Sequence, residues 1–202
     1  MLEEIKSILA FPYYRLAGYR PTRVPATAWD ERFRSGKYSY LEDLSQIGGL
    51  SIVFGYCQFL APKTILDVGC GYGSLTKNLK VLDYEYYLGI DVSAEAISQA
   101  QASYSDDRTE FIVADAIEFV SHHEFDVIIF NQCAYYFDNP QDVVQRYAKF
   151  LTPSGRIIVS MTDCGKTRAV WPLISRSMTV ENSITIAQDP GRNITKLLAP
   201  RR

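Results

Sequence analysis

The sequence predicts a doubly wound, Rossmann-like α/β fold, and two patterns support this prediction. Between residues 63 and 161, short apolar runs alternate with runs of helical period. Several of the apolar runs have no polar alternation, which is typical of parallel strands buried on both faces of a sheet. The chain has 202 residues, of which 47% are hydrophobic and 22% charged, as expected for one globular domain.

The elements of this alternating core follow in a regular order. Its apolar runs predict strands at residues 64–69, 86–92, 109–115, 125–131 and 156–161. Helices are expected between them at residues 73–82, 93–104, 116–120 and 139–151. Ser93 is the expected N-cap of the second helix, and Pro140 lies in the first turn of the last. The tetrapeptide "TPSG" predicts a turn before the fifth strand.

The segments on either side of this core are expected to belong to the same domain, which spans residues 1–202. Residues 1–60 predict an N-terminal helical lid, in which a helix follows a loop rich in Tyr, Pro and Arg. Residues 162–202 predict a C-terminal helix and then a β-hairpin, because two strand-like runs flank the turn signal "DPGRN". The core itself is taken as residues 61–161.

Composition and charge argue against several classes of protein. The net charge is −2 and the basic residues are dispersed, so no nucleic-acid partner is expected. The N-terminus begins acidic without a signal-peptide pattern, and no apolar run approaches the ~20 residues that cross a bilayer. The four cysteines are scattered without CxxC spacing, so neither a metal site nor a disulfide framework is expected. We therefore expect a cytoplasmic protein with no membrane partner and no bound metal.

The stretch "ILDVGCGYGSL" predicts a nucleotide-like ligand at the carboxyl edge of the sheet. Its glycines, Gly69, Gly71 and Gly73, directly follow the first strand. A dinucleotide would place its pyrophosphate at the N-terminus of the next helix. The carboxylate of Asp67 would repel that group, and Ser74 follows the third glycine where GxGxxG would continue. A ligand with positive charge and no phosphate, such as S-adenosylmethionine, fits better.

Two further carboxylates are expected at the same edge. Asp91 ends the second strand, where it can accept hydrogen bonds from both hydroxyls of a ribose. Asp115 ends the third, where it can accept a hydrogen bond from the amino group of an adenine. Asp67, Asp91 and Asp115 are spaced by 24 residues, one strand–helix unit each, so they are expected to line one rim. Each alone is equally well explained as a helix N-cap. Their joint occurrence beside a glycine turn favours a cationic nucleoside.

These segments resemble the motifs of class I S-adenosylmethionine-dependent methyltransferases. "ILDVGCGYG" is similar to the first motif of that superfamily, "GIDVS" to its ribose-binding acid and "VADA" to its adenine-contacting segment. "FDVIIFNQCAYYF" resembles the fourth-strand motif, and "LTPSGRIIVSM" the fifth strand. The resemblance covers roughly residues 61–161, the expected cofactor-binding core. It implies a mostly parallel, seven-stranded sheet with an antiparallel strand in the C-terminal hairpin.

The resemblance assigns a part of S-adenosylmethionine to each of these positions. Asp67 and the three glycines would surround the methionine part, while the other two acids keep the ribose and adenine contacts described above. Three neighbours are added by the resemblance alone. Val92 would pack on the adenine, Ala116 would meet it, and Asn131 would stand near the sulfonium.

The expected activity is methyl transfer to an oxygen or nitrogen of a small-molecule acceptor. "TAWDERFRSGKYSYLEDL" resembles the lid of small bacterial methyltransferases that act on sugars, nodulation-type glycolipids or other secondary metabolites. In "NQCAYYFD", after the fourth strand, Tyr135 and Tyr136 are the candidate catalytic residues, although packing between helix and sheet explains them equally well. The pattern identifies no general base. The candidate lid residues are Trp29, Phe33, Tyr38 and Tyr40.

Three alternatives remain open at the level of sequence. A nicotinamide-dependent oxidoreductase shares the fold, but it conflicts with Asp67 and with the missing GxGxxG. A methyltransferase-like protein that binds the nucleoside and serves as a non-catalytic partner is compatible with the absence of an identified base. A methyltransferase acting on a protein substrate is a third possibility.

Overall fold

The computed structural model of this chain describes residue 21 and residues 23–188 and 191–201. The first 20 residues of the expected lid therefore lie outside the described residues. So do residues 189–190 of the expected hairpin turn.

Seven strands form one sheet in the order β3-β2-β1-β4-β5-β7-β6, which confirms the predicted fold class. β1 to β5 run parallel to one another, whereas β7 is antiparallel to both β5 and β6. The strand order reverses between β1 and β4, the place where ligands bind in open α/β sheets. The strands are β1 (Thr64–Val68), β2 (Tyr86–Asp91), β3 (Thr109–Val113), β4 (Phe125–Asn131), β5 (Leu151–Thr162), β6 (Met178–Ala187) and β7 (Arg192–Pro200).

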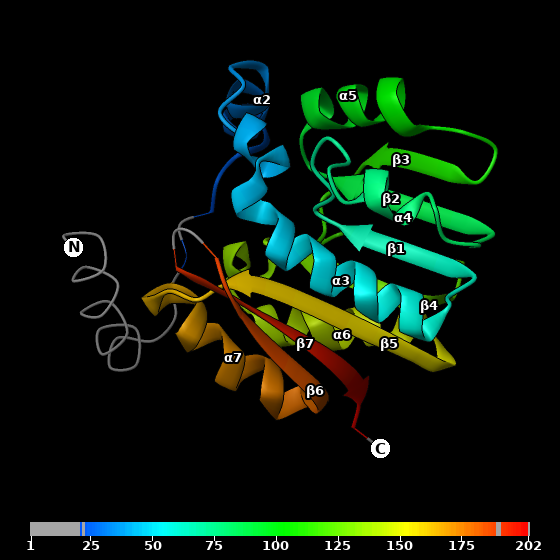
Figure 1. The fold of residues 1–202 in the computed structure, drawn as a ribbon, viewed down its shortest axis with the longest axis vertical. Coiled ribbons are helices and arrows are strands. Elements are labelled where there is room, and N and C mark those ends of the chain that lie inside the picture. Colours follow the sequence, from blue (N-terminus) through cyan, green and yellow to red (C-terminus); the bar gives the residue numbers. More distant parts are fainter. Residues whose placement is uncertain (1–20, 22, 189–190, 202) are drawn as a thin grey trace.

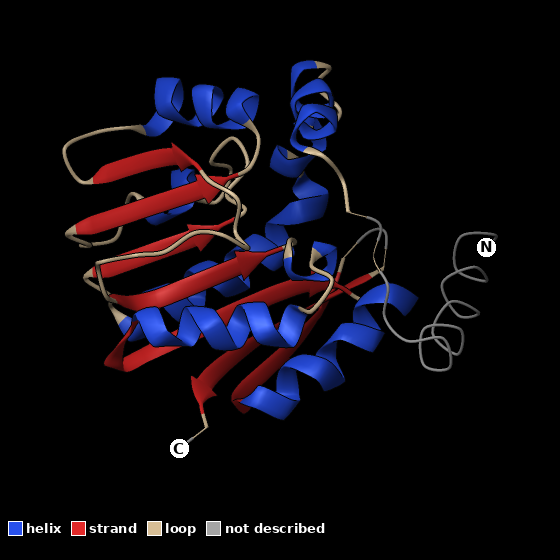
Figure 2. Cartoon of the chain, turned by 180° about the vertical axis from the view of Figure 1, so that it is seen from behind, coloured by secondary structure: helices blue, strands red, loops and turns tan. Residues whose placement is uncertain are grey.

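Helices lie on both sides of the sheet. Figures 1 and 2 show α3 in front of one face, and α6 and α7 against the opposite face. Within the described residues, no helix has both the length and the apolar character needed to span a membrane. The α-helices are α2 (Ala26–Arg34), α3 (Ile47–Leu60), α4 (Thr76–Leu79), α5 (Ala94–Tyr104), α6 (Pro140–Tyr147) and α7 (Gly165–Ser177). The described part of the chain also forms four short 3₁₀ helices: η1 (Ser39–Glu42), η2 (Leu44–Gln46), η3 (Ala134–Tyr136) and η4 (Ala148–Phe150).

Two hydrophobic cores fill the spaces on the two faces, as the two-residue period of a strand requires. On β1, Leu66 and Val68 belong to the core that contains the buried residues of α6 and α7. Ile65 belongs to the other core, which contains buried residues of α3, α4 and α5. Asp67 lies two residues after Ile65 and points to the same face of the sheet, so its side chain lies on the α3 side.

The glycine turn shortens the helix that was expected at residues 73–82. α4 contains only Thr76–Leu79, because Gly73 has a φ of 85° and cannot serve as a helical residue. The helix expected at residues 116–120 is also absent. The Asp115 carbonyl accepts from the N–H groups of Glu118 and Phe119 instead, which closes a single turn. The Asp115 carboxylate also accepts from the N–H of Ile117 at 2.8 Å, which favours a turn over a longer helix.

Two further predictions about elements are wrong. "TPSG" lies inside β5 and not before it, because Leu151 already pairs with Phe125 of β4. The register then shifts to Val127 with Arg156, so residues 152–155 leave the regular ladder. In the N-terminal segment, α2 forms where a loop was expected.

Candidate functional site

The glycine turn lies over the end of β2. The N–H groups of Gly69 and Cys70 donate to the carbonyl of Ile90 at 2.8 and 3.0 Å. The three glycines of the turn have φ values of 71°, 57° and 85°, which residues with a side chain rarely adopt. A Cβ at Gly69 would stand 2.8 Å from the Cβ of Cys133. The turn therefore presents bare backbone to the space between β1 and β4.

Asp67 is 1% exposed and lies at the end of β1. Its Oδ2 accepts the hydroxyl proton of Tyr87 at 2.8 Å, while its Oδ1 is buried without a hydrogen-bond partner in the described chain. Burial raises the pKa of this carboxyl to about 7, and the Tyr87 hydrogen bond acts in the opposite direction. A buried carboxylate with an open oxygen is poorly solvated, so a bound cation stabilises it.

Asp91 fastens the turn to the beginning of α5. Its Oδ2 accepts from the N–H of Gly71 and its Oδ1 from the N–H of Ser93, both at 2.9 Å. Burial raises the pKa of Asp91, although these backbone donors lower it. Each carboxylate oxygen has a second lone pair, so Asp91 can still accept a hydrogen bond from a ligand hydroxyl. Ser93 caps α5 as predicted, accepting from the N–H of Ala96 at 3.1 Å.

Asp115 pairs with an arginine of the lid. Its Oδ1 accepts from the N–H of Ile117 at 2.8 Å, and its Oδ2 accepts from the guanidinium of Arg23 at 2.7 Å. Both side chains keep contact with solvent, Arg23 more than Asp115. An adenine amino group that approached Asp115 would therefore share this carboxylate with Arg23.

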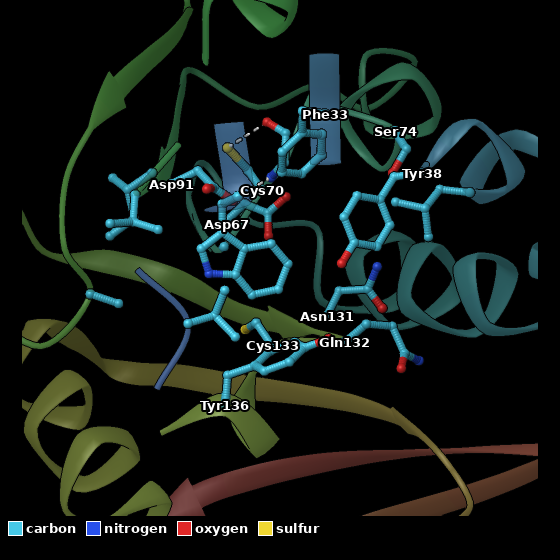
Figure 3. A pocket seen from close by; sticks show the side chains of 18 of the residues that line it. Phe33, Tyr38, Asp67, Cys70, Ser74, Asp91, Asn131, Gln132, Cys133 and Tyr136 are labelled. Carbon is cyan, nitrogen blue, oxygen red and sulfur yellow. Dashed lines mark hydrogen bonds between the residues drawn. The ribbon is translucent and has the colours of Figure 1, made fainter. Parts of the chain in front are cut away.

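One cavity of about 580 Å³ brings the predicted residues together. Figure 3 shows Asp67, Cys70 and Asp91 on one side of it, with Gln132, Cys133 and Tyr136 on the other. Gly73 does not line the cavity, because it packs toward Tyr104 of α5. All the other predicted site residues do: Asp67, Gly69, Gly71, Asp91, Val92, Asp115, Ala116, Asn131, Tyr135 and Tyr136.

The four lid candidates also line this cavity and form an aromatic cluster. The ring of Trp29 lies 6.0 Å from Tyr38 and meets the edge of Tyr136 at 4.9 Å between centroids. Phe33 lies 5.0 Å from Tyr38, which is 6.0 Å from Tyr40. Offset and edge-to-face rings at such distances attract one another. The lid is thus packed directly onto the residues that follow β4.

The rings of Tyr135 and Tyr136 pack beside each other at an interplanar angle of 46°, with centroids 4.5 Å apart. The ammonium of Lys166 lies 5.1 Å from the first ring and 4.8 Å from the second. Burial raises the pKa of Tyr135 well above its usual value and that of Tyr136 to about 12. Both phenols are therefore neutral at physiological pH, where they can donate a hydrogen bond but cannot act as bases.

We call the wall formed by α2, residues 38–50, residues 131–137 and Asn193 the lid half of the cavity. Arg23 precedes α2 and is counted with its partner Asp115 in the cofactor half. Among the described lining residues of the lid half there is no Asp, Glu, Lys, Arg or His. Its polar groups are tyrosine hydroxyls and the amides of Gln46, Asn131, Gln132 and Asn193. Gln132 has a φ of 57° and accepts from the N–H of Thr162 at 3.0 Å, so the backbone is strained at the cavity wall.

Several lining residues have no signal in the sequence pattern. Arg23 lies in the N-terminal segment, and Asn193 lies on β7, 120 residues after Gly73. Asn193 is 2% exposed, and its Oδ1 accepts from the hydroxyls of Ser160 and Thr195 at 3.0 Å each. The chain fold alone brings these residues to the cavity. His122 and His123 lie just before β4 and do not line the cavity.

The cavity suits a cationic nucleoside better than a diphosphate. Three carboxylates line it, and Arg23, already paired with Asp115, is the one basic side chain among the described lining residues. The bare glycine turn can hold a ligand closely, and the open oxygen of Asp67 can receive an ammonium or sulfonium. A pyrophosphate at the same place would face Asp67 and Asp91 without a free cation.

Residues 66–159 match the family model described as a methyltransferase domain. This match, together with the strand order of the sheet, identifies residues 66–159 as a class I S-adenosylmethionine-dependent methyltransferase domain. This assignment confirms the predicted family, and with it the cofactor of that family, S-adenosylmethionine. The matched residues include the glycine turn and all three carboxylates of the rim.

Relatives in sequence are also methyltransferases. A ubiquinone biosynthesis O-methyltransferase of Neisseria meningitidis is 26% identical over 144 residues, which make up 69% of this chain and 58% of that protein. A malonyl-acyl-carrier-protein O-methyltransferase of Priestia megaterium is 30% identical over 97 residues, 48% of this chain and 35% of that protein. This class I family member therefore spans only part of the length of these relatives.

Solved structures share the fold of this methyltransferase-family chain. The N-methyltransferase NodS from Bradyrhizobium japonicum WM9, in complex with S-adenosyl-L-homocysteine, has a TM-score of 0.65 at 16% identity, covering 80% of this chain and 91% of that one. The plantazolicin methyltransferase BpumL, in complex with a pentazolic desmethylPZN analog and SAH, has a TM-score of 0.62 at 18% identity. That match covers 98% of this chain and 100% of the other. At these identities the likeness concerns the fold.

Proposed function

We propose that this protein uses S-adenosylmethionine to methylate an oxygen or nitrogen of a small molecule, such as a sugar, a glycolipid or another secondary metabolite. The observation that carries the proposal is the open, buried oxygen of Asp67 in the cavity wall. A bound cation would stabilise that carboxylate, and the described residues around it provide none. The names of the relatives give further support, since they include both O- and N-methyltransferases.

The residues of the rim would divide the cofactor among them. Asp67 would receive the positive charge of the methionine part, and the bare backbone at Gly69 and Gly71 would lie against it. Asp91 would accept the ribose hydroxyls with the lone pairs that its backbone donors leave free. Val92 would pack on the adenine. Asp115 and Ala116 would meet the adenine edge, with Asn131 near the sulfonium.

When bound, S-adenosylmethionine supplies a methyl group activated by its sulfonium. The protein's part is to orient the acceptor and to exclude water. Tyr135 and Tyr136 are neutral and share a hydrogen bond, so the pair would hold the acceptor through its one remaining phenol proton. Trp29 and Tyr38 close the cavity over them. Because the lid half has no charged side chain among its described lining residues, we expect an acceptor that is uncharged when bound.

Calorimetric titration with S-adenosylmethionine, S-adenosylhomocysteine and NAD tests the cofactor assignment. We expect micromolar binding of both adenosyl compounds and no signal from NAD. Asp67→Ala and Asp91→Ala should weaken S-adenosylmethionine binding by about tenfold or more, since loss of a buried charged partner costs above 1.4 kcal/mol. Asp107→Ala is the matched control, because Asp107 is exposed and does not line the cavity.

Wild-type affinity in both cavity variants would refute the site, and binding of NAD alone would favour an oxidoreductase. Once binding is established, neutral sugars, phenols and amines are tested as acceptors by the release of S-adenosylhomocysteine. Cofactor binding without turnover on any of them would favour the non-catalytic partner role. Turnover with proteins alone would favour a protein methyltransferase.

Three statements about the wider protein stay predictions. The division into a lid at residues 1–60, a cofactor-binding core at 61–161 and a C-terminal part at 162–202 is our proposal for how the cavity is assembled. A cytoplasmic location and the absence of a nucleic-acid partner are expectations from composition.

A further inference from the structure

We propose that Tyr87 is a positioning residue for the cofactor site. Together with Thr76 it forms a buried hydrogen-bond chain that holds the Asp67 carboxylate with one oxygen left for the ligand. The inference rests on the proposed function, because it takes Asp67 as the group that receives the positive charge of S-adenosylmethionine. Tyr87 itself does not line the cavity, so it would act through Asp67 and not by touching the ligand.

The chain joins three neighbouring elements. The hydroxyl of Thr76, the first residue of α4, donates to the hydroxyl of Tyr87 on β2 at 2.8 Å. Tyr87 donates in turn to Oδ2 of Asp67 on β1 at 2.8 Å. All three side chains are at most 1% exposed, so water does not replace any of these bonds. The chain is therefore a fixed part of the core on the α3 side.

Strand register explains why Tyr87 reaches Asp67. In the parallel pair of β1 and β2, Ile65 lies beside Tyr87 and Asp67 lies beside Gly89. Tyr87 and Gly89 point to the same face of the sheet, two residues apart. Since Gly89 has no side chain, the long ring of Tyr87 is the β2 group that extends diagonally to the carboxylate.

The direction of the two hydrogen bonds favours the charged form of Asp67. A phenol has one proton, and Tyr87 directs its proton to Oδ2, so its oxygen is free to accept from Thr76. Both protons thus point toward the carboxylate, and each bond strengthens the next. Because Oδ2 accepts the hydrogen bond from Tyr87, Oδ1 is the oxygen without a hydrogen-bond partner in the described chain.

No other described group near Asp67 supplies positive charge. The titratable groups that face it come from α3, the glycine turn, β2 and the segment after β4, and all are acids: Cys57, Cys70, Tyr87, Asp91 and Cys133. Asp91 raises the pKa of Asp67, and Tyr87 is the group that lowers it. Without the Tyr87 proton, Asp67 would take up a proton at a higher pH and lose its attraction for a cation.

The test is the pH profile of S-adenosylmethionine binding to Tyr87→Phe, measured by calorimetry from pH 6 to 9. Wild-type affinity should rise as pH increases through about 7, where Asp67 ionises. Loss of one hydrogen bond to the charged form should move this rise up by about one pH unit, so that binding at pH 7 weakens by about tenfold and recovers at higher pH. Thr76→Val should shift the profile in the same direction by less.

Tyr84→Phe is the matched control. Tyr84 is also a buried tyrosine of the same core, 6.0 Å from the Tyr87 ring, but its hydroxyl pairs with that of Thr109 at 2.9 Å. Loss of the Tyr84 hydroxyl should leave the pH profile of S-adenosylmethionine binding unchanged. The amino group of the ligand titrates identically in every titration, so a difference between variants reports on the protein.

A folded Tyr87→Phe protein with the wild-type pH profile would overturn the inference. If Tyr87→Phe does not fold, Thr76→Val decides in the same way, since it removes the outer donor and leaves the tyrosine in place. Failure of the proposed function looks different: Asp67→Ala would then bind S-adenosylmethionine as wild type does. If Asp67→Ala weakens binding while neither chain variant moves the profile, only the role of Tyr87 is wrong.

Discussion

Gly73 illustrates two different requirements for glycine within one turn. Its φ is 85°, as a tight turn demands, and a Cβ added to it would stand 2.7 Å from the ring of Tyr104. The motif places Gly73 beside the methionine part of the cofactor, yet the structure packs it against α5 and away from the cavity. By contrast, Gly69 and Gly71 line the cavity. Gly73 is thus needed for packing, and its two neighbours for access to the backbone.

Substitution by alanine separates strain from crowding. Gly36 has a φ of 69°, but a Cβ there would meet no atom within 4 Å. Gly36→Ala should therefore lower the free energy of unfolding by about 1 kcal/mol, the cost of a left-handed alanine. Gly73→Ala should cost about 2–4 kcal/mol, because overpacking adds to that strain. Urea unfolding measures both, and equal losses would mean that Tyr104 moves aside freely.

At the scale of elements, α2 completes the N-terminus of α5. The Oδ1 of Asp30 accepts from the hydroxyl of Ser93 at 2.7 Å and from the N–H of Glu95 at 3.1 Å. These donors lower the pKa of Asp30 and keep it charged, which suits the positive end of a helix dipole. Nε of Arg34 also forms an ion pair with Oε2 of Glu95 at 3.5 Å. Because α5 begins just after Asp91, the lid is tied to the loop that would hold the ribose.

Loss of this contact should loosen both elements together. Asp30→Ala should lower the free energy of unfolding by about 1 kcal/mol, the usual cost of a lost helix cap. It should also weaken S-adenosylmethionine binding by about threefold, since the lid becomes less well ordered. Asp30→Asn keeps an accepting oxygen and should restore most of both properties. Thermal melts measure the stability of the two variants, and calorimetry measures their affinity for S-adenosylmethionine. Equal losses in Asp30→Ala and Asp30→Asn would argue against a capping role.

At the scale of the whole molecule, stability depends on Asp67 because the fold buries it completely. Its pKa is about 7 in the folded protein, whereas the unfolded chain releases the same proton near the ordinary value of 3.8. Between these two values the folded state holds a proton that the unfolded state has lost. The contribution of Asp67 to stability therefore falls as pH rises from about 4 to about 7.

Asp67→Asn removes this titration and should flatten the pH dependence of unfolding. Relative to the wild type, the variant should gain stability progressively between about pH 4 and 7, by as much as about 4 kcal/mol. Guanidinium unfolding without ligand, repeated across this range, measures the difference. A constant offset between the two proteins would show that Asp67 has an ordinary pKa when folded.

Much of the cofactor side of the site is predictable from sequence because it depends on local rules. Consecutive parallel strands carry their last residues to one edge of the sheet, so the equal spacing of Asp67, Asp91 and Asp115 places all three at one cavity. The N-cap role of Ser93 also follows from its position before a helical run. The lengths of the elements were less predictable, since the glycine turn and the bulge in β5 override local preference.

The sequence by itself determined the alternating fold, the antiparallel hairpin and the glycine turn with its carboxylate rim, because strand period and turn chemistry act over a few residues. Only the tertiary structure decided which groups those carboxylates meet. Arg23 on Asp115, Tyr87 beneath Asp67 and Asn193 at the cavity wall depend on strand register and on the docking of the lid. Those contacts join residues far apart in the chain, and no local pattern encodes their distance.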